Sequence, residues 1–230
     1  FLAIDKVYTH NPKVFVVRGY VRAKQEKLNL ASEKYAVALS LDNNFIQAVV
    51  KLYQMTTLSL GHEAFQSLTN EILSKNENFH FMRNLLADHY LNIGDTVNTK
   101  VHYEILKEVE ELPNKAQVLN NLANILLKED LTLAEQYALN ALALDDTSSA
   151  ILDTYGWIKA LRGEFEESLT LLRRAYTMNS NDPAINYHLG YTLMKLNRVE
   201  EAKRELGRAL SSDINFSERD EAKALLESIK

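Results

Sequence analysis

Hydrophobic residues recur every three or four positions along most of the chain, with polar residues between them. This spacing places the hydrophobic side chains on one face of a helix. Clear examples are Ala31, Tyr35 and Ala38; Ala48, Leu52 and Met55; and Ala64, Leu68 and Ile72. No run of alternating β-branched residues is bounded by turn chemistry, so no strand is predicted. The pattern predicts an all-α chain.

In the last third of the chain the pattern repeats at an interval of 34 residues. Gly156 and Gly190 are separated by this interval, as are Tyr155 and Leu189, Glu167 and Glu201, Leu172 and Leu206, and Ala175 and Ala209. A fixed interval of this length indicates a helix-turn-helix unit that is used repeatedly. Small residues in the first helices predict close packing of paired helices; they are Gly19, Ala87, Ala123, Gly156 and Gly190.

The interval and the turn residues predict one solenoid domain over residues 1–230. Its units cover residues 12–45, 46–79, 80–115, 116–148, 149–182 and 183–216, and a capping helix follows over 217–228. Asp182 and Pro183 predict the start of a helix, and Ser217 with Asp220 predicts a capping box. Residues 1–11 are interpreted as the second helix of an incomplete unit, so we expect a segment excised from a longer chain.

Composition and charge narrow the class of protein. The 230 residues are 46% hydrophobic and 25% charged, with a formal net charge of −5, which is ordinary for a globular protein. Nucleic-acid binders usually carry a basic stripe, which this chain lacks. No window holds 18 uninterrupted apolar residues, so no transmembrane segment is predicted. The chain has no Cys and therefore no disulfide or thiolate metal site.

The units resemble the tetratricopeptide repeat, because Leu-Gly or Leu-Ala recurs in the first helices and spaced Ala residues recur in the second. Leu152–Ile158, Leu171–Ala175 and Tyr187–Gly190 resemble, more narrowly, the C-terminal repeats of bacterial tetratricopeptide lipoproteins of the PEP-CTERM and exopolysaccharide-associated type. The resemblance implies a right-handed α-α superhelix whose first helices line an inner groove. It also implies a periplasmic or membrane-anchored lipoprotein, with a cytoplasmic location as the alternative.

Within this resemblance, first-helix side chains that face the groove would bind a partner. They are Tyr20, Asn84, Asp88, Asn120, Asn124, Asp153, Trp157, Tyr187 and Tyr191. Asn amides can donate to and accept from an extended peptide backbone, and Trp and Tyr supply large contact areas. The Lys residues with which chaperone-binding members clamp a terminal carboxylate are absent from the corresponding positions, which hold Val16, Asn84, Asn120, Asp153 and Tyr187.

Two positions stay open for Trp157, the groove and the core. A groove position predicts that Trp157→Ala weakens partner capture and leaves the melting temperature largely intact. A core position predicts that the melting temperature falls.

No motif predicts an enzyme, a cofactor or a metal site. Phosphate-binding glycine loops and the nucleophile elbow are absent from the sequence. The His residues are His10, His62, His80, His89, His102 and His188, and none forms the i, i+4 pair that favours a metal on a helix. His188 is expected either at the edge of the groove or as a structural His with its hydrogen bonds satisfied.

The sequence therefore predicts a non-enzymatic protein–protein interaction scaffold that binds a peptide or protein ligand. By resemblance it would act in a bacterial envelope assembly, export or proteolysis system. The alternative is the substrate-recruiting arm of a larger enzyme such as a glycosyltransferase. A third prediction is self-association through Phe1 and Ile4 of the truncated N-terminal helix.

Overall fold

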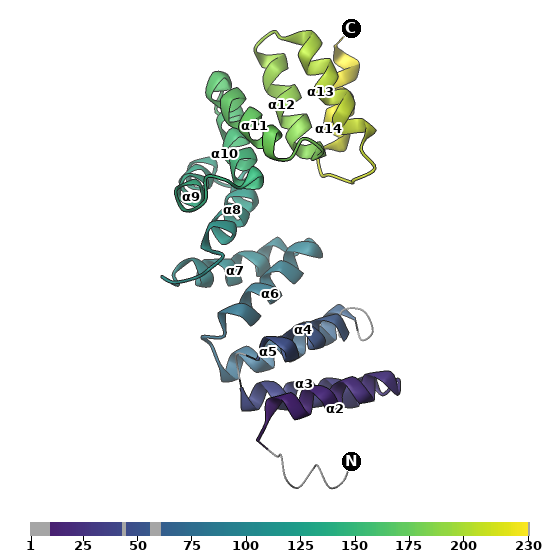
Figure 1. Cartoon of the computed structure of the whole chain (residues 1–230). Coiled ribbons are helices and arrows are strands. Elements are labelled where there is room, and N and C mark those ends of the chain that lie inside the picture. Colours follow the sequence, from purple (N-terminus) through teal and green to yellow (C-terminus); the bar gives the residue numbers. More distant parts are fainter. Residues whose placement is uncertain (1–9, 43–44, 56–60, 230) are drawn as a thin grey trace. The chain divides into compact units, whose positions relative to one another are not determined.

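The computed structural model describes residues 10–42, 45–55 and 61–229, and these residues form thirteen α-helices (Figure 1). Six are the first helices of pairs: α2 (Pro12–Lys24), α4 (Ile46–Met55), α6 (His80–Asn92), α8 (Lys115–Leu126), α10 (Ser149–Leu161) and α12 (Pro183–Lys195). Six are second helices: α3 (Leu28–Leu41), α5 (His62–Lys75), α7 (Thr96–Lys107), α9 (Leu131–Leu144), α11 (Phe165–Met178) and α13 (Val199–Ser211). The last is α14 (Arg219–Ser228). The all-α prediction is confirmed.

The chain divides into two compact units, with the boundary between His102 and Tyr103, inside α7. The core of the N-terminal unit is built around Tyr35, Phe65 and Phe79. The C-terminal unit has cores that contain, among others, Leu152, Leu172 and Leu206. The single domain expected from the sequence stays a prediction. The incomplete first unit, with Phe1 and Ile4, lies outside the described residues.

Within the N-terminal unit, α2 packs on α3, α3 on α4, and α5 on α6. In the C-terminal unit, α8 packs on α9, α10 on α11 and α12 on α13, while α10 also contacts α8, α9 and α12. As a result, every residue of α10 from Ile151 to Ala160 is buried except Asp153, which is partly exposed. A repeat cannot cover its own hydrophobic face, so its neighbours must do so. After the last pair, α14 packs on α13 and α12.

Glycines in the first helices allow the paired helices to approach closely. A Cβ on Gly156 would lie 2.9 Å from Leu172 Cγ, and a Cβ on Gly190 would lie 2.8 Å from Leu206 Cγ. A Cβ on Gly19 would overlap the ring of Tyr35 in the same way. Each Gly faces the residue sixteen positions later in its own unit. The predicted packing role of these glycines is confirmed.

Helix starts follow the predicted chemistry in one case and depart from it in another. Asp182 caps α12, since its carboxylate accepts a hydrogen bond from the N–H of Ala184 at 3.0 Å, and Pro183 is the first helical residue. The capping box predicted for α14 is wrong. The helix begins at Arg219, two residues later than expected, with Glu218 in the cap position, and the hydroxyl of Ser217 donates to Glu218 Oε2 at 2.6 Å.

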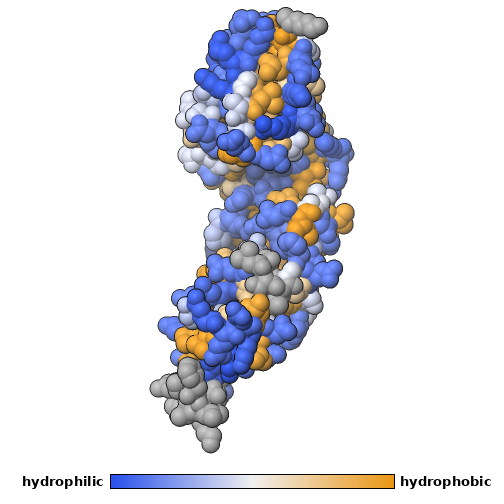
Figure 2. Space-filling model, turned by 90° about the vertical axis from the view of Figure 1, so that its right-hand side faces the viewer, coloured by the Kyte–Doolittle hydropathy of each residue, from blue (hydrophilic) through white to orange (hydrophobic). Residues whose placement is uncertain are grey.

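The surface carries hydrophobic residues in separate areas. On the face shown in Figure 2, hydrophilic residues cover most of the surface between these areas. Val97, Val101 and Ile105 are exposed and follow one face of α7. Among the described residues, no helix is both long enough and apolar enough to cross a membrane.

Candidate partner-binding surface

Three of the predicted partner-binding residues belong to the N-terminal unit. Tyr20 on α2 is 50% exposed, and the ammonium group of Lys24 lies 5.7 Å from its ring centroid. Asn84 and Asp88 are half-buried on α6, where Asn84 Nδ2 donates to Asp88 Oδ2 at 2.9 Å. This unit therefore presents an aromatic ring and, on another helix, an amide paired with a carboxylate.

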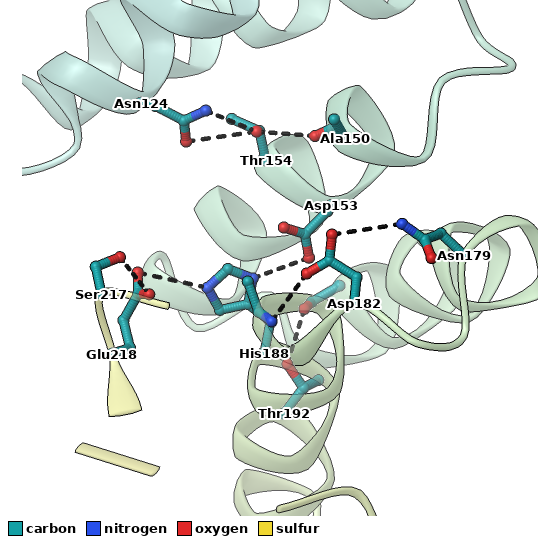
Figure 3. A network of polar contacts seen from close by, with 12 residues as sticks. Asn124, Ala150, Asp153, Thr154, Asn179, Asp182, His188, Thr192, Ser217 and Glu218 are labelled. Carbon is teal, nitrogen blue, oxygen red and sulfur yellow. Dashed lines mark hydrogen bonds and ion pairs between the residues drawn. The ribbon is translucent and has the colours of Figure 1, made fainter. Parts of the chain in front are cut away.

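Two predicted residues lie one turn apart on α8 and have different surroundings. Asn120 is buried, whereas Asn124 is exposed. Asn124 Nδ2 donates to the hydroxyl of Thr154 on α10 at 3.1 Å, and that hydroxyl donates to the carbonyl of Ala150 at 2.9 Å (Figure 3). Asn124 thus retains surface that a partner can reach, while Asn120 is largely enclosed by packing.

Asp153, another predicted residue, is paired with a buried His. The Nδ1 atom of His188 on α12 lies 2.8 Å from Asp153 Oδ1 on α10. On the opposite side of the ring, His188 Nε2 lies 3.9 Å from Oε1 of Glu218, at the start of α14 (Figure 3). The His188 side chain is only 7% exposed. Two carboxylates from separate helices therefore flank one buried imidazole.

The two carboxylates set the charge of His188. Burial alone would lower the pKa of His188, but the charge and hydrogen bond of Asp153, together with Glu218, outweigh burial and raise the pKa to about 9. In turn, the interaction with His188 lowers the pKa of Glu218 to about 2, against the opposing effect of burial. At neutral pH the site therefore holds a cation between two anions.

Three aromatic side chains surround this cation. Trp157 stacks on His188 with ring centroids 4.2 Å apart and planes at 15°. Tyr191 meets Trp157 edge-on at 5.0 Å, and Tyr187 lies 5.7 Å from Trp157. An indole face next to a cation is electrostatically favourable. We refer to Trp157, Tyr187, His188 and Tyr191 as the His188 cluster.

Burial decides between the two positions that the sequence leaves open for Trp157. Its exposed fraction is 8% and that of Tyr187 is 5%, so both side chains belong to the core, while Tyr191 is half-buried. The burial of Trp157 favours the core position over the groove position, and the effect of Trp157→Ala on melting stays a prediction. The stacked imidazole and neighbouring rings cover the indole. The contribution of all nine residues to partner binding stays a prediction.

The structure also contains a charged cluster around Lys159 that no repeat or motif in the sequence marks. The Lys159 ammonium is 2.7 Å from Glu164, 2.9 Å from Glu135 and 3.5 Å from Glu167. Burial alone would lower the pKa of Lys159, but hydrogen bonds to Glu164 and Glu135 raise it overall. The one sequence signal is a Lys within the hydrophobic stretch of α10. This cluster ties α9, α10 and α11 together, and its charges are already paired.

The His residues of the N-terminal unit have the opposite electrostatic setting. His89 is buried with its ring 5.0 Å from that of His62, and His102 stacks on Tyr90 at 5.7 Å. Burial, and then the charge of His62, lower the pKa of His89. Burial, and then Arg83, lower the pKa of His102. In the part of the chain that the structure describes, no group of three or more His, Asp or Glu residues could hold a metal ion.

A family model described as a tetratricopeptide repeat matches residues 160–229, which include α11, α12, α13 and α14. Together with the helix pairs and the close contacts at Gly156 and Gly190, this match decides the type of fold. The chain folds as a tetratricopeptide repeat solenoid. No curated protein sequence matches the chain.

Several solved structures have the same fold. PilF from Pseudomonas aeruginosa is 11% identical with a TM-score of 0.70, over 93% of this chain and 97% of PilF. PilW, named as a widely conserved type IV pilus biogenesis factor, is 13% identical with a TM-score of 0.64, over 94% of this chain and 98% of PilW. A chain of the Cut9–Hcn1 hetero-tetramer of the APC/C is 14% identical with a TM-score of 0.64. That match covers 98% of this chain but only 44% of the Cut9–Hcn1 chain.

Proposed function

We propose that this chain is a non-enzymatic scaffold of the tetratricopeptide kind that binds a peptide or protein partner through exposed side chains of its first helices. The observation that carries the proposal is the accessibility of polar and aromatic side chains on these helices. Tyr20 and Asn124 are exposed, while Asn84, Asp88 and Tyr191 are half-buried. Amides and phenol groups of this kind bind both backbone and side chains of a partner.

We further propose that the scaffold acts in the assembly of a bacterial envelope structure, as a periplasmic or membrane-anchored protein. PilW is named as a type IV pilus biogenesis factor, and the similarity extends over nearly the full lengths of PilW and PilF. The narrower resemblance of Leu152–Ile158 and Tyr187–Gly190 to bacterial lipoproteins supports the same context. The association with exopolysaccharide systems belongs to this proposal.

Site-specific photo-crosslinking in the source cells tests the binding surface. A photoreactive phenylalanine analogue replaces Tyr20 or Asn124 on the first helices. The matched controls carry it at Arg173 and Arg204, which are exposed on the second helices α11 and α13. We expect one discrete adduct from the first-helix positions and little from the controls. Adducts that form equally at all four positions, or only at the controls, would contradict the proposal.

A further inference from the structure

The connector between α13 and α14 is longer than the equivalent connectors before α10 and α12. Ser212–Glu218 has seven residues, whereas Asp145–Ser148 and Asn179–Asp182 each have four. The extra length lets the connector reach the His188 cluster. The ring of Phe216 packs against the surrounding core, with its centroid 6.4 Å from that of Tyr187.

Two side chains of the connector touch the cluster and their neighbours face solvent. The first is Phe216. The second is Glu218, whose Oε1 lies 3.9 Å from His188 Nε2 and whose Oε2 accepts a hydrogen bond from Ser217 at 2.6 Å. Ile214 is 59% exposed, and Asn215 is also exposed. The connector therefore contacts the cluster through an aromatic ring and a carboxylate two residues later, as a bound peptide with two anchors would.

The cluster is chemically suited to such a pair of anchors. His188 has a pKa raised to about 9 and is a cation at neutral pH. Asp153 hydrogen-bonds its Nδ1, and among the described residues no acceptor lies within hydrogen-bond distance of its Nε2. A carboxylate is therefore the natural complement on that side. The Tyr187 and Tyr191 rings favour an aromatic side chain beside it.

We propose that Phe216-Ser217-Glu218 is an internal ligand of the His188 cluster, and that the external partner presents the same chemistry. That partner is a peptide segment with an aromatic side chain and, two residues later, a carboxylate. The proposal rests on the scaffold function proposed above. It names the kind of segment that binds at α10 and α12, the two first helices nearest the C-terminus of the chain.

Glu218 makes the longer of the two carboxylate contacts with His188, which makes it the one open to exchange. The Glu218–His188 separation of 3.9 Å is longer than the 2.8 Å between Asp153 and His188. Because a tethered segment acts at an effective concentration of about a millimolar or more, an external peptide must compete with it. Weakening the internal ligand should therefore strengthen binding of the external one.

A synthetic peptide with the sequence of residues 213–219 tests this exchange. It is titrated into the wild-type chain and into the double variant Phe216→Ala/Glu218→Gln. Binding is followed by the fluorescence of Trp157, the one Trp of the chain, which stacks on His188. Ile214→Ala serves as the matched control variant, since it alters an exposed residue of the same connector. The control peptide carries Ala and Gln in place of the Phe and Glu anchors.

We expect the double variant to bind the peptide at least about tenfold more tightly than wild type and Ile214→Ala, with no response to the control peptide. A folded double variant that does not bind, or that binds both peptides equally, overturns the proposal. If circular dichroism shows that the double variant has lost its helices, Glu218→Gln alone is held to the same criterion. Failure of the peptide exchange would not change the crosslinks expected at Tyr20 and Asn124. The two experiments therefore distinguish failure of this inference from failure of the scaffold function.

Discussion

The charge on His188 makes the stability of the C-terminal unit depend on pH. An unperturbed His has a pKa near 6.5, whereas in the folded protein the pKa of His188 is raised to about 9. Protonated His188 therefore stabilises the fold fully below about pH 6.5, and this stabilisation is lost as the pH rises towards 9. The whole effect is on the order of 3 kcal/mol.

Chemical denaturation at pH values between 6 and 9.5, followed by Trp157 fluorescence, measures this loss. We expect the free energy of unfolding to fall with rising pH in the wild type. His188→Gln is less stable at pH 6, because it leaves Asp153 without its cation, but its stability should change little over the same range. An equal slope in both proteins would show that another group causes the pH dependence.

Trp157 is expected to contribute to the stability of the C-terminal unit. Its side chain is 8% exposed and stacks on His188. Removing a buried aromatic side chain costs roughly 3–5 kcal/mol, so Trp157→Ala should lower the melting temperature measured by circular dichroism. Tyr20→Ala is the matched comparison, because Tyr20 is half exposed and its removal should change stability by less than about 0.5 kcal/mol. Similar melting of the two variants would contradict the assignment of Trp157 to the core.

At the scale of the helix pair, close packing at Gly190 outweighs helix propensity. Ala favours a helix interior over Gly by about 1 kcal/mol. A Cβ at Gly190, however, would lie 2.8 Å from Leu206 Cγ and 3.3 Å from the Leu206 backbone nitrogen. Overpacking of this kind typically costs about 1–3 kcal/mol. We therefore expect Gly190→Ala to destabilise the C-terminal unit.

Gly207 supplies the control within the partner helix. It lies inside α13, and a Cβ there would meet nothing within 4 Å. Gly207→Ala should therefore raise the free energy of unfolding by up to about 1 kcal/mol. Urea denaturation of Gly190→Ala and Gly207→Ala, each compared with the wild type, measures the two changes in the free energy of unfolding. Destabilisation by both substitutions would indicate that the backbone of the helices, rather than the Gly190–Leu206 contact, controls the outcome.

The helix pairs could be predicted from the sequence because their signals are local. The spacing of Ala31, Tyr35 and Ala38, and the interval between Gly156 and Gly190, depend only on helix geometry and on the close approach of paired helices. The start of α12 follows from Asp182 and Pro183 for the same reason. The expected second-helix fragment at residues 1–11 falls mainly outside the described residues.

The candidate site could be predicted only in part, because burial depends on residues far away in the sequence. The sequence pattern places Asp153, Trp157, Tyr187 and Tyr191 on one side of the first helices. The contacts among these side chains also depend on His188. The second carboxylate that flanks His188 belongs to Glu218, 30 residues further along the chain. No periodic signal marks Glu218, since it lies in a connector whose length departs from the repeat.

For the whole molecule, the two units should respond to pH in opposite directions. In the N-terminal unit, the pKa values of His89 and His102 are lowered, mainly by burial. The neutral His side chains therefore stabilise this unit. Their contribution to stability is lost as the pH falls below about 6.5, the pKa of His in the unfolded chain. In the C-terminal unit, His188 stabilises most in its protonated form. Acidification from pH 8 to 5.5 thus weakens the first unit and strengthens the second.

Two spectroscopic probes separate these responses in the intact chain. Trp157 reports on the C-terminal unit alone, whereas far-ultraviolet circular dichroism reports on the helices of both units. We expect the urea midpoint of Trp157 fluorescence to rise between pH 8 and 5.5, while an earlier phase in circular dichroism moves to lower urea. His89→Phe keeps a ring against Phe65, 4.8 Å from the present imidazole, but cannot titrate. In this variant, acidification should move the early circular-dichroism phase less towards low urea. The urea midpoint of Trp157 fluorescence should be unaltered. If both probes move together in the wild type, the units unfold as one and the separate roles of His89 and His188 fail.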